Sequence, residues 1–294
     1  MFDDGMIAVD WGTTNRRAYR LSPQGVNEAE FEDDRGVTSV AAGAFPAAVA
    51  EVRARLGDLP LLLAGMVGSN RGWVEAGYVP CPADLSMLSA KLCWAEPERS
   101  AIVPGLSFQD AGRADVMRGE EVQLFGAVAA GLVPADALVC HPGTHNKWVL
   151  VVGGRIAEFR TVMTGEMFNH LKERSILADW LGSPVVVGEA FRAGVRQGLE
   201  GRALTADLFG VRAGVLLGRM AAADAASFTS GLLIGADVRT GVGQGATAPI
   251  AVMGRPTLTA LYAAALGEAG HACVEVDGET AFLAGITAIA RTIS

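Results

Sequence analysis

Two short apolar runs flank a polar turn in the stretch Ile7-Ala8-Val9-Asp10-Trp11-Gly12-Thr13-Thr14-Asn15-Arg16-Arg17-Ala18-Tyr19-Arg20-Leu21. Residues 7–9 predict a buried strand, and residues 18–21 predict its hairpin partner. Gly12 lets backbone N–H groups approach an anion closely, and the two threonine hydroxyls add donors. Asp10 offers a carboxylate where a hydrated Mg²⁺ ion can sit. An ordinary β-hairpin with a polar turn fits the same residues, so this stretch alone leaves both interpretations open.

A second turn of the same kind lies more than a hundred residues further along the chain. Val139 leads into the turn Pro142-Gly143-Thr144-His145-Asn146-Lys147, and the apolar run 148–152 follows it. Two such turns facing one cleft can clamp a polyphosphate from both sides. The basic residues of this chain are nearly all arginines, so a lysine inside this turn is notable.

Four blocks of the sequence resemble the 2-dehydro-3-deoxygalactonokinase family, within the sugar kinase/Hsp70/actin superfamily. They are AVDWGTTN (8–15), GMVGSNRGWVE (65–75), RGEEVQLFG (118–126) and PGTHNKW (142–148). The resemblance implies an α/β protein with the two-domain actin-like ATPase (ribonuclease H-like) fold and a cleft between the domains. We expect the domains to be residues 1–134 and 135–294, and the last helix is a candidate to pack back on the first domain.

The resemblance also implies a reaction. ATP would phosphorylate 2-dehydro-3-deoxy-D-galactonate to its 6-phosphate, a step of galactonate and galactose catabolism, and Asp10 would hold Mg²⁺ through water. The phosphates would be held by Gly12, Thr13 and Thr14 in one domain and by Gly143 and Thr144 in the other. Lys147 is a candidate cation for phosphate or substrate, and Gly254 would lie under the adenosine.

Two adjacent carboxylates fall in a helix that we expect to open at residues 115–121 and to run to about residue 130. Acidic residues in a first helical turn are favoured by the helix dipole, and this alone explains Glu120 and Glu121. In related sugar kinases, however, the catalytic base opens a helix that ends in a Leu-Phe-Gly-like run. Aligning residues 124–126 on that run places Glu120 nearest to the base, with a one-residue ambiguity. The family's usual base is Asp, so Asp115 is the reserve candidate.

The polar loop after the buried strand 59–64 is the candidate substrate site. Arg71 suits a substrate carboxylate because its planar fork binds two oxygens at once, and Arg16 is the alternative. A lone arginine on a solvated loop is the common case, but the glycine-rich setting and the resemblance favour substrate contact. Three further residues would set the orientation of the substrate: Asn15, Asn70 and Trp73.

Composition limits the remaining possibilities. The chain has 294 residues, of which 50% are hydrophobic and 19% charged, and its net charge of −8 argues against a nucleic-acid partner. No apolar run is long enough to span a membrane. The four cysteines form no C-x-x-C pair, and the acidic start lacks leader features, so we expect free thiols in a cytoplasmic protein. His141 and His145 flank Pro142-Gly143, which prevents the helix that metal ligation at this spacing would need.

The apolar patterns predict the other elements. Strands are expected at 26–31, 59–64, 101–106, 137–140, 148–152, 156–163 and 249–254. Helices are expected at 44–56, 165–181 with Thr164 as N-cap, 188–198, 204–223, 257–266 and 279–290.

Two alternatives to this function stay open. The protein could phosphorylate another sugar or sugar acid, because a Gly-Thr clamp does not read carbon stereochemistry. It could also be an actin-like ATP-binding protein without transfer chemistry, which would have no use for a base at Glu120. The sequence also leaves open whether the protein is a homo-oligomer.

Overall fold

The computed structural model describes residues 2–243 and 249–293, which form two compact units. The first unit comprises Met1–Ala135, Val151–Glu158 and Gly278–Ser294, and the second comprises Asp136–Leu150 and Phe159–Asp277. Met1 and Ser294, the outer ends of the two predicted domains, lie outside the described residues.

The first unit is built on a six-stranded sheet in the order β3-β2-β1-β4-β7-β6. Its strands are β1 (Met6–Trp11), β2 (Arg16–Leu21), β3 (Asn27–Asp33), β4 (Leu61–Gly65), β6 (Cys93–Glu96) and β7 (Ser100–Ile102). The predicted hairpin is confirmed, because β1 and β2 pair antiparallel from Met6↔Leu21 to Trp11↔Arg16. Helix α1 (Phe45–Leu56) buries one apolar face, including Val49 and Val52, in the same core as β1 and β4.

A three-stranded sheet, β5 (Tyr78–Pro80), β8 (Gly105–Gln109) and β9 (Ala114–Met117), also belongs to the first unit. The single strand expected at 101–106 is wrong: Pro104 has no N–H for a ladder, and the chain passes from β7 in one sheet to β8 in another. The helix expected from residue 115 is also wrong at its start. Asp115 lies in β9, opposite Phe108, and Gly119, at φ 104°, separates this strand from the helix.

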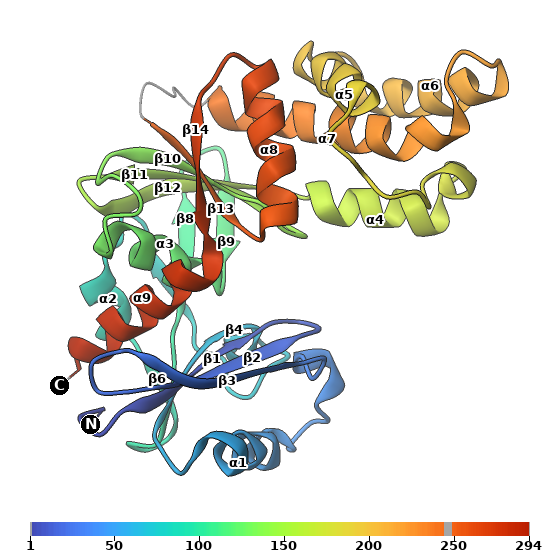
Figure 1. Ribbon diagram of the computed structural model, residues 1–294. Helices are drawn as coiled ribbons and strands as arrows, with labels where there is room; N and C mark the ends of the chain where they lie inside the picture. The colour runs from blue at the N-terminus through green and yellow to red at the C-terminus, as the bar shows by residue number, and fades with distance from the viewer. Residues whose placement is uncertain (1, 244–248, 294) are drawn as a thin grey trace. The chain divides into compact units, whose positions relative to one another are not determined.

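Helix α3 (Glu120–Ala129) crosses α9 (Gly278–Arg291) at two glycines (Figure 1). A Cβ atom on Gly126 would lie 2.0 Å from the Ala281 carbonyl oxygen, and one on Gly285 would lie 2.0 Å from that of Val122. Only glycine permits this approach of the two backbones. Short helices complete the unit: α2 (Leu85–Ser89) and the 3₁₀ turns Val37–Ser39 and Met66–Gly68.

The second unit contains most of a five-stranded sheet in the order β12-β11-β10-β13-β14. Its strands are β10 (Ala137–His141), β11 (Asn146–Val152), β12 (Arg155–Val162), β13 (Ile250–Gly254) and β14 (Cys273–Asp277). Strands β10, β13 and β14 run parallel, and α8 (Pro256–Glu268) connects the last two. The sequence did not predict β14, an edge strand in which Val276 alone is buried.

Four helices form the rest of the second unit: α4 (Thr164–Arg174), α5 (Glu189–Leu199), α6 (Leu204–Leu216) and α7 (Ala225–Val242), with 3₁₀ turns at Ala178–Trp180 and Ala222–Asp224. Figure 1 shows α5 and α6 beside the long α7. Two predicted helices end early. The first stops at Arg174, because Ser175 is extended and its hydroxyl bonds the Leu171 carbonyl, and the second stops at Leu216, before Gly218 at φ 67°.

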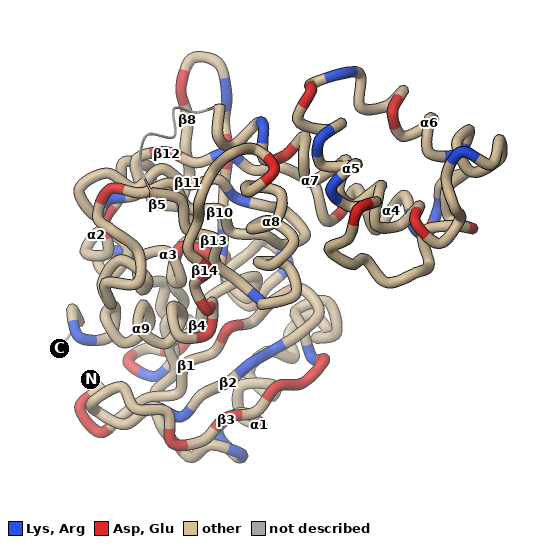
Figure 2. The backbone as a smooth tube through the Cα atoms, turned by 45° about the horizontal axis from the view of Figure 1, so that its top comes forward, with Lys and Arg blue, Asp and Glu red and all other residues tan. Residues whose placement is uncertain are grey.

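Charged side chains on the first sheet are segregated by strand, with basic residues on β2 and acidic residues on β3. Figure 2 shows the basic residues of β2 next to the acidic residues of β3. Arg17 pairs with Glu32 and Arg20 with Glu28 across the two strands, which favours their antiparallel pairing. Within the described part of the chain, no helix is long and apolar enough to cross a membrane.

Candidate active site

The first Gly-Thr turn, residues 12–15, is fixed through its carbonyl groups. The N–H groups of Gly36, Val37 and Thr38 bond the carbonyl oxygens of Thr14, Gly12 and Thr13 at 3.0, 3.0 and 3.2 Å. Within residues 2–243 and 249–293, the N–H groups of Thr13 and Thr14 donate no hydrogen bond. Backbone amides that point away from their own support form a concave donor site for an anion.

Asp10 lies one residue before the end of β1, beside this turn, and is half-buried. Gly65 at the end of β4 is its neighbour, since a Cβ there would lie 3.5 Å from Asp10 Oδ1. Gly119 in turn packs on Gly65, with 3.2 Å from its ideal Cβ position to the Gly65 Cα. Both glycines have positive φ, at 92° and 104°, which other residues rarely adopt. The two glycines therefore bring the start of α3 close to Asp10.

Two carboxylates begin α3 in different surroundings. Glu120 is half-buried and accepts the Arg118 N–H at 3.1 Å, whereas Glu121 is fully buried and accepts the Gly119 N–H at 2.7 Å. The second carboxylate oxygen of Glu121 has no hydrogen-bond partner among the described residues. Burial, reinforced by the negative charge of Glu120, raises the pKa of Glu121 to about 8. Glu121 is therefore protonated at neutral pH, and the half-buried Glu120 is the more accessible member of the pair.

The loop after β4 is held tightly and turns two side chains outward. The Ser69 hydroxyl donates to the Met66 carbonyl at 2.8 Å, and the Trp73 N–H donates to Val67 at 2.8 Å. Asn70 and Arg71 are exposed, and within the described chain the Arg71 guanidinium makes no ion pair. The ring of Trp73 is only partly exposed because it packs on the core of the first unit.

Arg118 supports this loop, a role that the sequence analysis missed. Its guanidinium donates to the Gly77 carbonyl at 2.8 Å and lies 4.5 Å from the centre of the Tyr78 ring. Its Nη1 atom occupies the space that a Cβ on Gly68 would need. The residue before the Gly-Glu-Glu motif therefore ties the start of α3 to the candidate substrate loop.

The structure corrects the prediction for Arg16. Its side chain is 0% exposed, its Nε and Nη2 bond both oxygens of Asp33 at 3.2 and 2.8 Å, and its Nη1 bonds the Ala48 carbonyl. Burial would raise the pKa of Asp33, but the hydrogen bonds and charge of Arg16 outweigh burial and hold this pKa low. A fully buried guanidinium whose Nε/Nη2 fork is occupied by Asp33 is not available to a substrate carboxylate. Neighbouring Asn15 remains exposed beside the turn.

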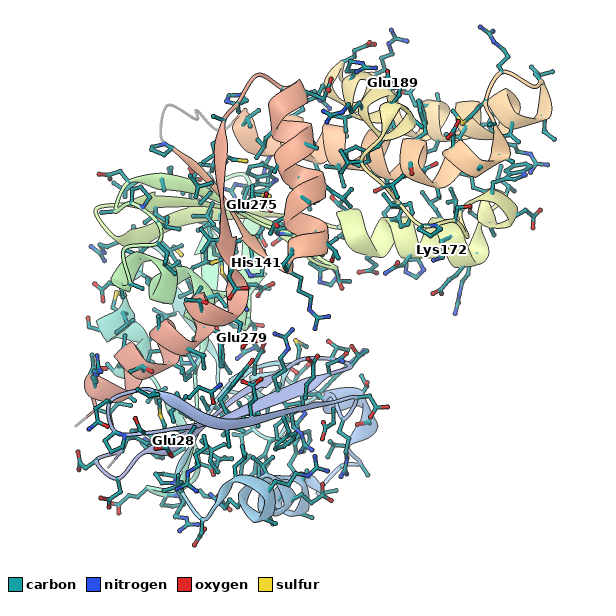
Figure 3. All side chains as sticks on the ribbon, viewed as in Figure 1. Glu28, His141, Lys172, Glu189, Glu275 and Glu279 are labelled. Carbon is teal, nitrogen blue, oxygen red and sulfur yellow. The ribbon has the colours of Figure 1, made fainter. Side chains whose placement is uncertain are left out.

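The second Gly-Thr turn, residues 142–145, exposes its amides in the same way. The Thr144 carbonyl accepts the Glu166 N–H at 2.9 Å, while the N–H groups of Gly143 and Thr144 donate to nothing among the described residues. An added Cβ on Gly143 would meet no atom within 4 Å. Figure 3 shows His141 at the end of β10, directly before this turn. The turn therefore has open space at Gly143 and two amides without an acceptor among the described residues.

A cavity of about 230 Å³ begins at this turn. Gly143 and Thr144 form one end, and the walls come from the start of α4, the middle of α7 and the face of α8. The walls are largely apolar: Phe168, Leu233, Ile234, Leu258, Leu261 and Tyr262. An apolar cavity that ends in free amides suits a ligand with a flat apolar part and an anionic part.

Three predicted residues of this region have other positions than expected. Lys147 is 3% exposed, and its ammonium bonds the His145 carbonyl at 3.0 Å inside its own turn. Gly254 ends β13 beside Pro142 and does not line the cavity. Thr164 is the first residue of α4 rather than its N-cap, because its hydroxyl bonds Asp237 at 2.5 Å.

Carboxylates are few around the second turn. The Glu166 carboxylate bonds His145, and its Oε1 lies 3.4 Å from His170 Nε2. The hydrogen bond with His145 is the main cause that lowers the pKa of Glu166. No group of three or more His, Cys, Asp or Glu residues in the described chain could hold a metal ion. Beside the first turn, Asp10 offers a partly exposed carboxylate, and Mg²⁺ commonly binds to proteins through one or two carboxylates and water.

Two sheet-based units with Gly-Thr turns that expose their amides are the features expected of the actin-like ATPase class. The fold is shared with the (R)-2-hydroxyglutaryl-CoA dehydratase component A of Acidaminococcus fermentans, with a TM-score of 0.54, 12% identity and coverage of 99% of both chains. This likeness confirms the predicted fold class.

The chain belongs to the 2-keto-3-deoxy-galactonokinase family, which it matches over residues 10–289. It is 40% identical to the 2-dehydro-3-deoxygalactonokinase of Escherichia coli (strain K12), over 98% of each chain. It also superposes on the crystal structure of a putative 2-dehydro-3-deoxygalactonokinase from Sinorhizobium meliloti with a TM-score of 0.91 and 36% identity, covering 98% of this chain and 99% of that one. The predicted family and the predicted 2-dehydro-3-deoxygalactonokinase activity are confirmed, and the protein is an ATP-using sugar-acid kinase.

Proposed function

We propose that the protein transfers the γ-phosphoryl group of ATP to the 6-hydroxyl group of 2-dehydro-3-deoxy-D-galactonate. The observation that carries this proposal is the pair of Gly-Thr turns with free amides, one beside Asp10 and Glu120 and one beside an apolar cavity. In the transfer, a bond forms between the hydroxyl oxygen and phosphorus, ADP leaves, and the hydroxyl proton passes to a base.

The two turns bind phosphate oxygens in this proposal. The amides of Thr13 and Thr14, with their exposed hydroxyls, serve the first unit, and those of Gly143 and Thr144 serve the second. The adenosine occupies the cavity walled by α4, α7 and α8, whose apolar lining fits a base and whose open end lies at the turn. Lys147 contributes a positive charge beneath the second turn rather than a direct phosphate contact.

Asp10 holds Mg²⁺ through water. Its carboxylate is partly accessible beside the free amides, and a single carboxylate with water molecules fits the octahedral shell of this ion. When bound, Mg²⁺ neutralises charge on the phosphates. Asp10 itself orients the hydrated ion, which is why its geometry beside Gly65 and Gly119 matters.

Glu120 takes the hydroxyl proton. It is the accessible carboxylate at the start of α3, whereas buried Glu121 keeps its own proton at neutral pH. A protonated Glu121 removes one of the two adjacent negative charges at the start of α3. Asp115, the reserve candidate, lies in β9. It is therefore not at the start of α3, which was the reason for considering it as the base.

Arg71 binds the substrate carboxylate, and Asn15, Asn70 and Trp73 help to orient the sugar acid. Arg71 has the exposed guanidinium fork that this contact needs, with no ion-pair partner among the described residues, and backbone hydrogen bonds hold its loop. Arg16 is not part of this proposal, because its guanidinium is hydrogen-bonded to the Asp33 carboxylate.

The experiment is an ATP-consumption assay with a panel of sugar acids and neutral sugars, followed by ³¹P and ¹³C NMR of the product. We expect ADP release to depend on 2-dehydro-3-deoxygalactonate and the phosphate to be on carbon 6. Equal activity with an epimer or a neutral sugar would contradict the substrate. ATP hydrolysis that no added sugar acid changes would point to an actin-like ATPase without transfer chemistry.

A further inference from the structure

A buried carboxylate on α7 connects the elements around the candidate nucleotide cavity. Asp237 is 1% exposed and accepts four side-chain hydrogen bonds. The donors are the Thr164 hydroxyl at 2.5 Å, the Tyr262 hydroxyl at 2.6 Å, the Trp148 indole N–H at 2.7 Å and the Asn146 amide at 3.0 Å. Acidic residues are rarely buried this completely unless they are paired, so four donors around one carboxylate is a specific arrangement.

The four donors come from three elements that surround the ligand site. Asn146 and Trp148 lie on β11, directly after the second Gly-Thr turn; Thr164 is the first residue of α4; and Tyr262 lies on α8. Thr164 and Tyr262 also line the cavity, whereas Asp237 does not. The Asp237 side chain therefore holds three elements in place: the strand β11 that follows the turn, and the α4 and α8 walls of the cavity. It does so without lining the cavity itself.

The link from Thr164 to the turn is short. Gly165, the next residue, packs so closely on the turn that a Cβ atom would lie 2.4 Å from the Gly143 carbonyl oxygen and 2.9 Å from the Thr144 Cα. The Glu166 N–H then bonds the Thr144 carbonyl at 2.9 Å. A shift of α4 at Thr164 would consequently move the residues whose amides face the open side of the turn.

We propose that Asp237 is a positioning residue for nucleotide binding: it fixes the second Gly-Thr turn and the α4 and α8 walls of the cavity without touching the ligand. This inference rests on the proposed function, since it takes ATP as the occupant of the cavity. A fully satisfied buried network specifies one geometry of its members, which is what a preorganised site requires. A network that only stabilised the fold would leave ATP affinity unchanged in the folded protein.

The test is Asp237→Asn, which keeps the size of the side chain but introduces an amide NH₂ where donors already point. Binding of Mg²⁺ and the non-hydrolysable analogue AMPPNP is measured by calorimetry, with the KM values of ATP and of the sugar acid and the thermal midpoint alongside. We expect a rise of about tenfold or more in the Kd of AMPPNP and in the KM of ATP, because a displaced binding group loses much of its effect. The KM of the sugar acid should stay within about twofold of the unmodified protein, because no donor to Asp237 belongs to the first unit.

Thr259→Val is the matched control. Thr259 is a buried polar residue of α8, 2% exposed, which bonds Glu275 rather than Asp237 and lines no part of the nucleotide cavity. It should lower stability without changing the Kd of AMPPNP. A folded Asp237→Asn protein with normal AMPPNP affinity would overturn the positioning role, whatever its thermal midpoint.

Tyr262→Phe keeps the proposal testable if Asp237→Asn does not fold. It removes one of the four donors and leaves the ring in place, so the Kd of AMPPNP should rise by a smaller factor, about threefold. An unchanged Kd would contradict the proposal. Absence of AMPPNP binding by the unmodified protein is a separate result, because it would overturn the proposed function itself.

Discussion

The two Gly-Thr turns expose their amides alike but differ in what supports and surrounds them. The first is held by main-chain hydrogen bonds from residues 36–38 and lies beside carboxylates. The second is held by side chains that converge on Asp237 and opens into an apolar cavity. This difference suggests a division of work, in which the first unit carries the chemistry and the sugar acid and the second selects the nucleotide.

The largest expected effect comes from Asp10. Asp10→Asn should reduce phosphoryl transfer to background, because an amide binds a hydrated Mg²⁺ poorly, while the fold stays intact. Steady-state kinetics across a Mg²⁺ titration, with circular dichroism for the fold, measures this. Asp34→Asn, an exposed acid of the same unit, should behave like the unmodified protein. Full activity in folded Asp10→Asn would end the proposal that the first turn is the catalytic one.

Glu120→Gln should lower kcat by about 10²–10⁴, the usual cost of losing a general base, with both substrates still bound. Single-turnover rates report the chemical step. If Glu120 served only the helix dipole, the variant would instead lose about 0.3–1 kcal/mol of stability and keep its rate. The rate and the thermal midpoint of this one variant therefore separate the two roles.

Arg71→Lys keeps the charge but loses the planar fork, so we expect kcat/KM for the sugar acid to fall by about one to two decades, or roughly 1.5–3 kcal/mol. The KM of ATP should barely change. Arg99→Lys, at an exposed ion pair with Asp58, is the control. An effect on ATP alone would place Arg71 on the nucleotide side and break the division between the units.

Glu121 should make stability depend on pH. The unfolded side chain ionises near 4.5, whereas the folded one keeps its proton to about 8. The contribution of Glu121 to the free energy of unfolding is complete below pH 4.5. It is lost as the pH rises towards 8, at up to about 1.4 kcal/mol per pH unit. Denaturant unfolding of Glu121→Gln at several pH values should lack this slope. Parallel curves for the two proteins would show that Glu121 is ionised when buried.

The smallest effect is expected at the support of the first turn. The Thr38 hydroxyl bonds the Thr13 carbonyl at 2.8 Å, but the Thr38 N–H bonds the same oxygen. Thr38→Val should therefore change the Kd of AMPPNP by less than about fivefold, since one neutral hydrogen bond contributes about 1 kcal/mol at most here. A tenfold loss would mean that the first turn, like the second, depends on side chains.

The turns and most of the sheet strands followed from the sequence because their signals are local. Apolar runs around Gly12 and Gly143 give strand, turn and strand without knowledge of distant residues. The start of α3 did not follow, because residues 114–117 pair with β8, a contact that the local pattern does not contain. Which glutamate faces inward depends on that start, so the separate roles of Glu120 and Glu121 were hidden as well.

Arg16 and Asp237 show why the roles of site residues are hard to predict from the sequence. Arg16 stands next to a phosphate turn in sequence, but its partner Asp33 is two strands away. Asp237 is a lone acid in the apolar run 232–238, and its four donors lie up to 91 residues away. The one available signal was the acid itself, because a carboxylate on a buried helix face requires partners.

The crossing of α3 and α9 has a consequence for the order in which the protein folds during its synthesis. The two helices meet backbone to backbone at Gly126 and Gly285, yet all of the second unit lies between them in sequence. A ribosome therefore delivers the whole second unit before the first can bury the face of α3. The side of α3 that faces α9, at Val122 and Gly126, therefore stays uncovered until the last helix of the chain has been synthesised.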